Sequence, residues 1–148
     1  MNNPILLIVV AQMFGTSLWF STNGVLKQIE QIWSLSTGDL GLLTNSVQFG
    51  FIIVTLLFSV TGFADKFKPS RIVMLCCFLG ATSNALIVLE EISFTFVIFS
   101  RLIVGVALAG IYPIGMKLII SWEPQKAHNT LGLLVGMLVL GSSLPYLI

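Results

Sequence analysis

One arginine stands inside a long apolar run of this sequence. If that run is a membrane-spanning helix that begins near Phe94, Arg101 lies about 10 Å into it, at a rise of 1.5 Å per residue. Inserting an arginine near the centre of such a span costs about 2.5–3.5 kcal/mol, so its guanidinium needs acceptors. We expect Arg101 to face a polar cavity, where it would favour an anionic ligand. The alternatives are that it reaches the outer headgroups or binds backbone carbonyls of a neighbouring helix.

A stripe of polar side chains marks the first apolar segment. Its members recur at helical spacing and fall within an arc of about 60°: Gln12, Thr16, Trp19 and Asn23. A weaker stripe in the second segment contains Gln48, and Tyr112 lies within about 40° of Arg101 on its own helix, as does Gly105. These side chains are candidates to line one cavity. The alternative is that they form hydrogen bonds between helices.

Residues that could support enzyme chemistry are few. His128 lies in a connection, Cys76 and Cys77 are adjacent in an apolar run, and no apolar segment holds a carboxylate. Neither a metal-ligand spacing nor a phosphate-binding loop occurs. We therefore predict that the chain is not an enzyme and needs no metal or cofactor. A net charge of +1 without a large basic cluster also argues against a nucleic-acid partner.

Composition indicates which elements position these residues. Of the 148 residues 56% are hydrophobic and only 9% are charged, and the mean hydropathy is +1.01. The bilayer is the expected solvent, and the chain is predicted to be an all-α integral membrane protein of about five transmembrane helices without a soluble domain. The expected spans are 4–23, 40–62, 72–89, 94–120 and 130–148. Because the last run is still apolar at Ile148, we expect a fragment of a longer chain.

Details of these spans can also be predicted. Asp39 is expected to cap the second span, and Pro113 is expected to kink the fourth span near Gly110. The pair Gly132 and Gly136 has the GxxxG spacing of closely packed membrane helices.

Orientation follows from the distribution of lysine and arginine. The second and fourth connections and their flanks carry five of these residues, whereas the opposite side carries Lys27; the five are Lys66, Lys68, Arg71, Lys117 and Lys126. Because such residues are retained on the cytoplasmic side, we expect a multi-pass protein of the cell membrane with a cytoplasmic N-terminus.

The second connection resembles the signature between the second and third helices of the major facilitator superfamily. That signature reads Gly, three residues, Asp, Arg or Lys, any residue, Gly, and then basic residues. Asp65, Lys66 and Arg71 match it, whereas Thr61 and Lys68 stand where the glycines are expected.

Two further features carry the resemblance. Arg101 and Gly105 are similar to the Arg-x-x-x-Gly motif of the superfamily's fourth helix, and 17–21 and 110–117 look like bacterial members, which would place the chain in the inner membrane. Gly105 is also expected to support helix packing.

What the resemblance implies is a secondary transporter of twelve helices in two six-helix halves, which carries a small solute by alternating access. This chain would supply the first five helices, with a small-molecule substrate, the lipid bilayer and the C-terminal helices of the same carrier as partners. Asp65 would bind a helix N-terminus of the second half as a conformational latch, and Lys66 and Arg71 would hold that loop. The alternative is a truncated, transport-incompetent membrane fragment or an assembly subunit.

Overall fold

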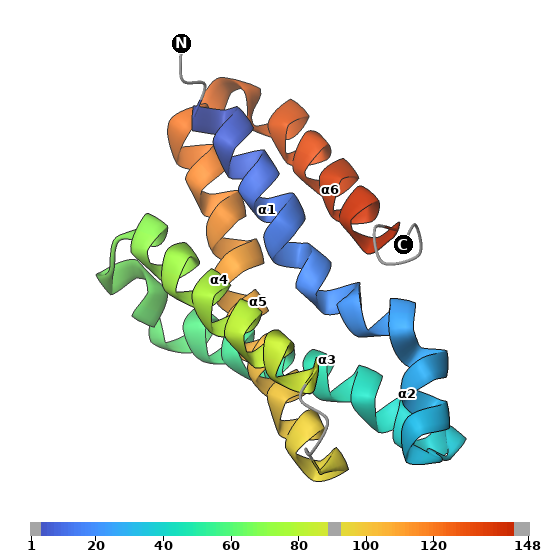
Figure 1. Ribbon diagram of the computed structural model, residues 1–148. Coiled ribbons are helices and arrows are strands. Elements are labelled where there is room, and N and C mark those ends of the chain that lie inside the picture. Colours follow the sequence, from blue (N-terminus) through green and yellow to red (C-terminus); the bar gives the residue numbers. More distant parts are fainter. Residues whose placement is uncertain (1–3, 89–92, 144–148) are drawn as a thin grey trace.

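The computed structural model describes residues 4–88 and 93–143, and all of its regular elements in those ranges are helices (Figure 1). The long helices are α1 (Pro4–Phe20), α3 (Thr37–Thr61), α4 (Pro69–Ala85), α5 (Phe94–Trp122) and α6 (Ala127–Ser143). Shorter elements join them: η1 (Ser21–Val25), α2 (Leu26–Trp33), η2 (Phe63–Lys66), η3 (Leu86–Val88) and η4 (Pro124–Lys126). The prediction of an all-α membrane fold is confirmed.

Local sequence signals account for several helix ends. At the start of α3 the Ser36 side chain accepts a hydrogen bond from the Asp39 backbone N–H, and the Asp39 carboxylate accepts from the Ser36 backbone N–H at 2.9 Å. The N-cap residue is therefore Ser36, three residues before the expected cap Asp39. Asp39 lies inside the helix, and its carboxylate completes a capping box with Ser36. Gly62 ends α3 with a φ of 60°, a left-handed conformation that glycine adopts without strain.

The first helix ends earlier than the expected span. Its α-helical part stops at Phe20, and the next five residues form the 3₁₀ helix η1. Asn23 lies in η1, so the arc that was predicted from α-helical spacing applies only as far as Trp19. The polar stretch between the first two expected spans contains the amphipathic helix α2.

Helix α5 is the centre of the bundle. It packs against α3, α4 and α1, and α1 in turn packs against α6 (Figure 1). More residues are buried on α5 than on any other described helix. Pro113 lies within α5, yet the helix continues through it to Trp122.

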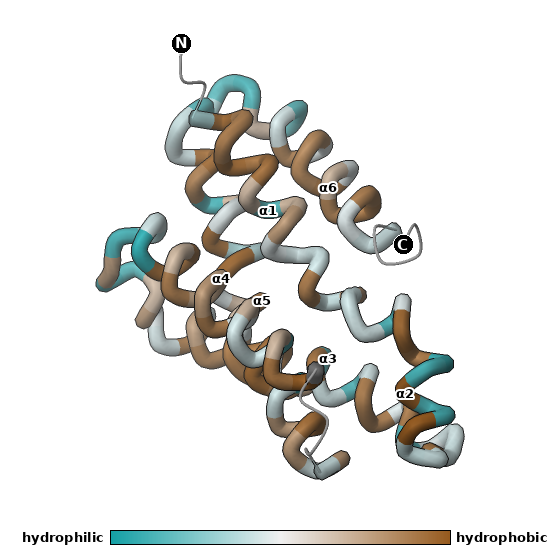
Figure 2. The backbone as a smooth tube through the Cα atoms, viewed as in Figure 1, coloured by the Kyte–Doolittle hydropathy of each residue, from teal (hydrophilic) through white to brown (hydrophobic). Residues whose placement is uncertain are grey.

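The outer surface is apolar. Large hydrophobic side chains such as Leu7, Val60 and Phe78 are exposed, Val60 to 84%. Hydrophilic residues are concentrated at the turns and in α2, and the helices between them are hydrophobic (Figure 2). This distribution is what a lipid-facing surface requires, because water would not favour it.

Three described helical stretches are long and apolar enough to cross a membrane: Pro4–Trp33, Thr37–Thr61 and Phe94–Trp122. The expected spans 72–89 and 130–148 correspond to α4 and α6, which have 17 described residues each. Residue 89 and residues 144–148 of these two expected spans lie outside the described residues.

Two glycines allow α3 and α5 to come close together. A Cβ atom on Gly105 of α5 would overlap the backbone oxygen of Val47 and lie 2.9 Å from the backbone nitrogen of Phe51. A Cβ atom on Gly50 of α3 would likewise overlap the backbone oxygen of Leu102. The two backbones are therefore in direct contact, as small residues permit in membrane helices.

The GxxxG pair has different surroundings. Added Cβ atoms on Gly132 and Gly136 would meet no described atom within 4 Å. The contact of α6 with α1 instead passes through Gly141, where a Cβ would lie 3.0 Å from the backbone oxygen of Met13. A packing role for Gly132 and Gly136 stays a prediction and would need a helix outside the described residues.

Candidate functional site

Arg101 is buried in the middle of the bundle, with 1% of its surface exposed. Its Nη2 donates to the backbone oxygen of Trp19 at 2.8 Å, and its Nη1 donates to the Asn84 Oδ1 at 3.1 Å and to the backbone oxygen of Leu18 at 3.3 Å. Among the described residues it makes no ion pair. One guanidinium therefore ties α5 to α1 and α4.

The end of α1 explains why these carbonyls are available. Leu18 and Trp19 lie in the last turn of α1, where carbonyl oxygens lose their intrahelical donors and carry the negative end of the helix dipole. Ser21 adds to the cluster by donating to Asn84 Oδ1 at 2.9 Å. Arg101 thus binds carbonyls of a neighbouring helix, which is one of the arrangements expected from the sequence. Its role in a cavity stays a prediction.

Gln12 forms the second polar contact between α1 and α5. It is 2% exposed, and its Nε2 donates to the backbone oxygen of Ile111 at 2.8 Å. Pro113 has no N–H, so the carbonyl that loses its intrahelical donor is that of Ala109, four residues earlier; Ile111 lies two residues further along the same turn of α5. Gly115 makes the contact possible, since a Cβ there would overlap the Gln12 side-chain amide.

Both buried groups retain an unpartnered polar atom. Gln12 Oε1 and Arg101 Nε are each buried without a hydrogen-bond partner among the described residues. In a membrane interior water does not readily supply the missing partner, and an unmade buried hydrogen bond costs about 1–3 kcal/mol.

The other cavity candidates are dispersed. Thr16 is buried and donates to the Gln12 backbone oxygen at 2.7 Å, and the Trp19 ring lies 5.1 Å from the Phe51 ring of α3. Asn23 is half-buried in η1, and Tyr112 is half-buried against the Val9, Ile119 and Leu134 cluster.

Gln48 lies apart from this group. It is exposed on α3, where it lines a pocket with Asn45, Phe49 and Ile52. The structure therefore brings Gln12, the Trp19 carbonyl and Arg101 to the contact of α1 with α5. The Thr16 hydroxyl instead lies beside Gly141 of α6, and Gln48 lies elsewhere on α3.

Three residues of this site were missed from sequence. Asn84 and Ser21 complete the Arg101 cluster, and Gly115 accommodates Gln12. Asn84 carried a usable signal, because it is an amide within an apolar span. Among the described residues no three His, Cys, Asp or Glu side chains are grouped as a metal site would require.

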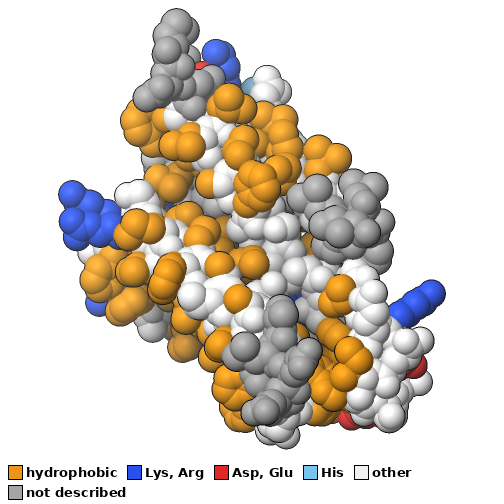
Figure 3. Space-filling view, viewed as in Figure 1, with side chains coloured by type: hydrophobic (Ala, Val, Ile, Leu, Met, Phe, Trp, Pro, Cys, Tyr) orange, Lys and Arg blue, Asp and Glu red, His pale blue; other side chains and the backbone are white. Residues whose placement is uncertain are grey.

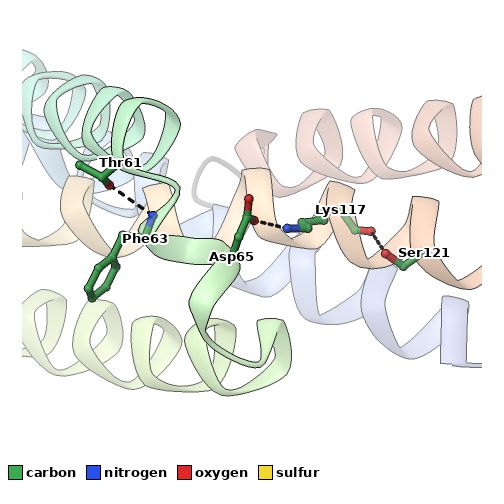
Figure 4. A network of polar contacts seen from close by, with 5 residues as sticks. All are labelled: Thr61, Phe63, Asp65, Lys117 and Ser121. Carbon is green, nitrogen blue, oxygen red and sulfur yellow. Dashed lines mark hydrogen bonds and ion pairs between the residues drawn. The ribbon is translucent and has the colours of Figure 1, made fainter.

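The expected latch residues are placed by η2. Asp65 forms an ion pair with Lys117 of α5 (Figure 4). The Thr61 hydroxyl supports the turn by accepting from the Phe63 backbone N–H at 3.2 Å. Lys66 and Arg71 are exposed and make no ion pair among the described residues.

These features define an all-helical, multi-pass membrane protein with polar groups buried between its spans. A family model described as the Major Facilitator Superfamily matches residues 5–148, and the chain belongs to that superfamily. This confirms the resemblance to the superfamily, and the roles assigned to individual motif residues stay predictions. Members of the superfamily are transporters. Comparison with curated proteins and with solved structures gives no match.

Proposed function

We propose that this chain supplies the N-terminal helices of a secondary active transporter, which moves a small solute across the cell membrane by alternating access. Membership of the superfamily supports the transporter class. The grouping of lysine and arginine at the second and fourth connections supports a cytoplasmic N-terminus. The C-terminal helices of the same carrier are its partner in this proposal, and they would complete the substrate site.

The observation that carries the proposal is the pair of unpartnered atoms on Gln12 and Arg101. Each lies on a side chain that is at least 98% buried, beside the contact of α1 with α5. Gln12 contacts α5 at Ile111, ten residues or about 15 Å along the helix from Arg101, so the two atoms offer separate contacts. Arg101 Nε would donate to an acceptor group of the solute, and Gln12 Oε1 would accept from a donor. Because the positive charge of Arg101 is not balanced by a described acid, the substrate is proposed to be an anion. Thr16, Trp19, Asn23, Gln48 and Tyr112 are the further proposed cavity residues.

The proposed latch gives Asp65 two alternating partners. Its ion pair with Lys117 holds η2 against α5 within this chain. In the other conformation of the carrier, Asp65 would leave Lys117 and bind a helix N-terminus of the second half, where the helix dipole favours a carboxylate. Lys66 and Arg71 would hold the loop in place during this exchange.

Transport by the intact carrier in proteoliposomes tests the proposal. The probes are radiolabelled small carboxylates and organic phosphates, with neutral sugars of similar size for comparison. We expect saturable uptake of an anion. Arg101→Lys should reduce this uptake by about tenfold or more, because lysine keeps the positive charge but lacks the planar guanidinium that can bind an anion through two parallel hydrogen bonds. Lys27→Gln, which changes an exposed charge, is the matched control and should leave uptake unchanged.

Two outcomes would count against this function. Unchanged uptake by a folded Arg101→Ala carrier would remove the proposed cavity role of Arg101. An intact protein that shows no saturable flux with any probe would favour the alternative, a transport-incompetent fragment or assembly subunit. Size-exclusion chromatography of each variant separates loss of transport from loss of folding.

A further inference from the structure

A groove of about 610 Å³ lies where α3 ends and α4 begins, around η2. This volume is within the range of small-molecule sites in proteins, about 300–1,000 Å³. The groove takes residues from all three elements and from the link between η2 and α4; it is lined by Phe58, Phe63, Lys66, Phe67, Lys68, Arg71, Ile72, Leu75 and Cys76. None of these residues belongs to the candidate site around Arg101.

One part of the lining is positively charged. Lys66, Lys68 and Arg71 are exposed, no acid lines the groove, and none of the three makes an ion pair among the described residues. The nearest acid in sequence is occupied elsewhere, because Asp65 pairs with Lys117. In Figure 4 the Asp65 carboxylate and the Phe63 ring lie on different sides of η2. The charges that face the groove are therefore all of one sign.

The rest of the lining is apolar and aromatic. The Phe63 ring lies 6.1 Å from the Phe58 ring and 5.0 Å from the Phe67 ring, which gives a continuous aromatic wall. Phe63 and Phe67 remain 49% and 53% exposed, and Leu75 is 62% exposed. Leu75 is one helical turn further along α4 than Arg71, so the apolar lining runs from the charged end toward the middle of the span.

Both chemistries meet on one face. Figure 3 shows lysine and arginine side chains gathered over the turn between α3 and α4, directly beside a hydrophobic surface. A soluble anion would contact only the charged part, and a neutral lipid would leave three cations unmatched. An anionic amphiphile matches both parts.

We propose that this groove is a binding site for an anionic phospholipid. The lipid phosphate lies among Lys66, Lys68 and Arg71, and one acyl chain lies along the phenylalanines and Leu75. Basic pockets between membrane helices have the chemistry that lipid head groups require, and juxtamembrane cations are attracted to anionic leaflets. The occupied groove would fasten the α3–α4 connection to the membrane surface. The groove shares Lys66 and Arg71 with the proposed latch, but lipid binding to it does not require that the chain transports a solute.

Native mass spectrometry of the purified full chain in detergent tests the proposal. The probes are phosphatidylglycerol and phosphatidylcholine with the same acyl chains, titrated separately. We expect phosphatidylglycerol to bind more tightly. The triple variant Lys66→Gln, Lys68→Gln, Arg71→Gln should weaken it by about 100-fold, because each cation near the surface contributes about fivefold.

Matched variants distinguish specific lipid binding in the groove from nonspecific electrostatic attraction between an anionic lipid and the protein. The double variant Lys27→Gln, Lys126→Gln removes exposed cations that do not line the groove and should leave phosphatidylglycerol affinity within about twofold. Leu75→Trp fills the apolar part of the groove and should abolish the phosphatidylglycerol adduct while Lys66, Lys68 and Arg71 remain. Circular dichroism of each variant confirms that the helices are retained.

Three results would overturn the proposal. One is unchanged phosphatidylglycerol binding by the folded triple variant. Another is full displacement of phosphatidylglycerol by inorganic phosphate together with no effect of Leu75→Trp, which would indicate a soluble anion. The third is a dimer that carries no lipid and is lost in the triple variant, which would indicate a second copy of the chain in the groove.

Discussion

Replacing Gly105 with alanine should push α3 and α5 apart. The added Cβ atom would overlap the backbone oxygen of Val47 and lie 2.9 Å from the backbone nitrogen of Phe51. Both are main-chain atoms of α3, so no side-chain rotation can relieve the overlap. Val47, Val104 and Leu108 form a buried cluster at this contact, and separation of the helices would loosen it as well.

The magnitude follows from two opposing effects. Overpacking a close contact costs about 1–3 kcal/mol, and the upper value applies because the backbone must move. Alanine is about 1 kcal/mol more favourable than glycine within a helix, which offsets part of that cost. We therefore expect Gly105→Ala to lower the free energy of unfolding by about 2 kcal/mol, a factor of about 30 in the unfolding equilibrium.

The measurement is equilibrium unfolding in mixed micelles of rising dodecyl sulfate fraction, followed by circular dichroism. Gly136→Ala is the control, because a Cβ there meets no described atom within 4 Å. It should leave stability unchanged or raise it by up to about 1 kcal/mol. Equal midpoints for Gly105→Ala and the unmodified chain would refute the close backbone contact.

Two further predictions use the same unfolding assay. Ser36→Ala should destabilise the chain by about 1 kcal/mol, because it removes the side-chain cap of α3, and Ser36→Thr should restore most of the loss; no loss in the alanine variant would contradict the capping role. A double-mutant cycle of Asp65→Asn and Lys117→Gln should give a coupling of about 0.2–1 kcal/mol, because both side chains are solvent-accessible, and the coupling should shrink as salt is raised. Zero coupling at low salt would show that the two side chains do not interact.

Much of the fold follows from the hydropathy of the sequence and from the proline and glycine residues at helix ends. The apolar run from Phe94 predicted the start of α5, and Pro69 and Gly62 mark the boundaries of the α3–α4 turn. Helical periodicity was less informative at the end of α1, where the helix changes to the 3₁₀ form after Phe20. Nothing in the spacing of polar residues signals that change.

The candidate site was predictable in its residues but not in its pairings. The cost of burial singled out Arg101, and helical spacing singled out Gln12. Spacing describes a residue relative to its own helix axis and cannot say which neighbouring helix it contacts. Asn84 became a partner of Arg101 only through the packing of α4 on α5. For the same reason the GxxxG spacing of Gly132 and Gly136 predicted a packing surface on α6 but not its partner. No described helix packs closely on that surface.

The hydrogen bond from Gln12 to Ile111 joins residues 99 positions apart, and the bond from Arg101 to Trp19 spans 82. At a synthesis rate of about 5–20 residues per second, α5 emerges from the ribosome about 5–20 seconds after α1. During that delay the amide of Gln12 and the last carbonyls of α1 need temporary partners, such as water, lipid headgroups or the insertion machinery. The polar contacts of this bundle therefore make the assembly of α1 a late event in biogenesis, although α1 is translated long before α5.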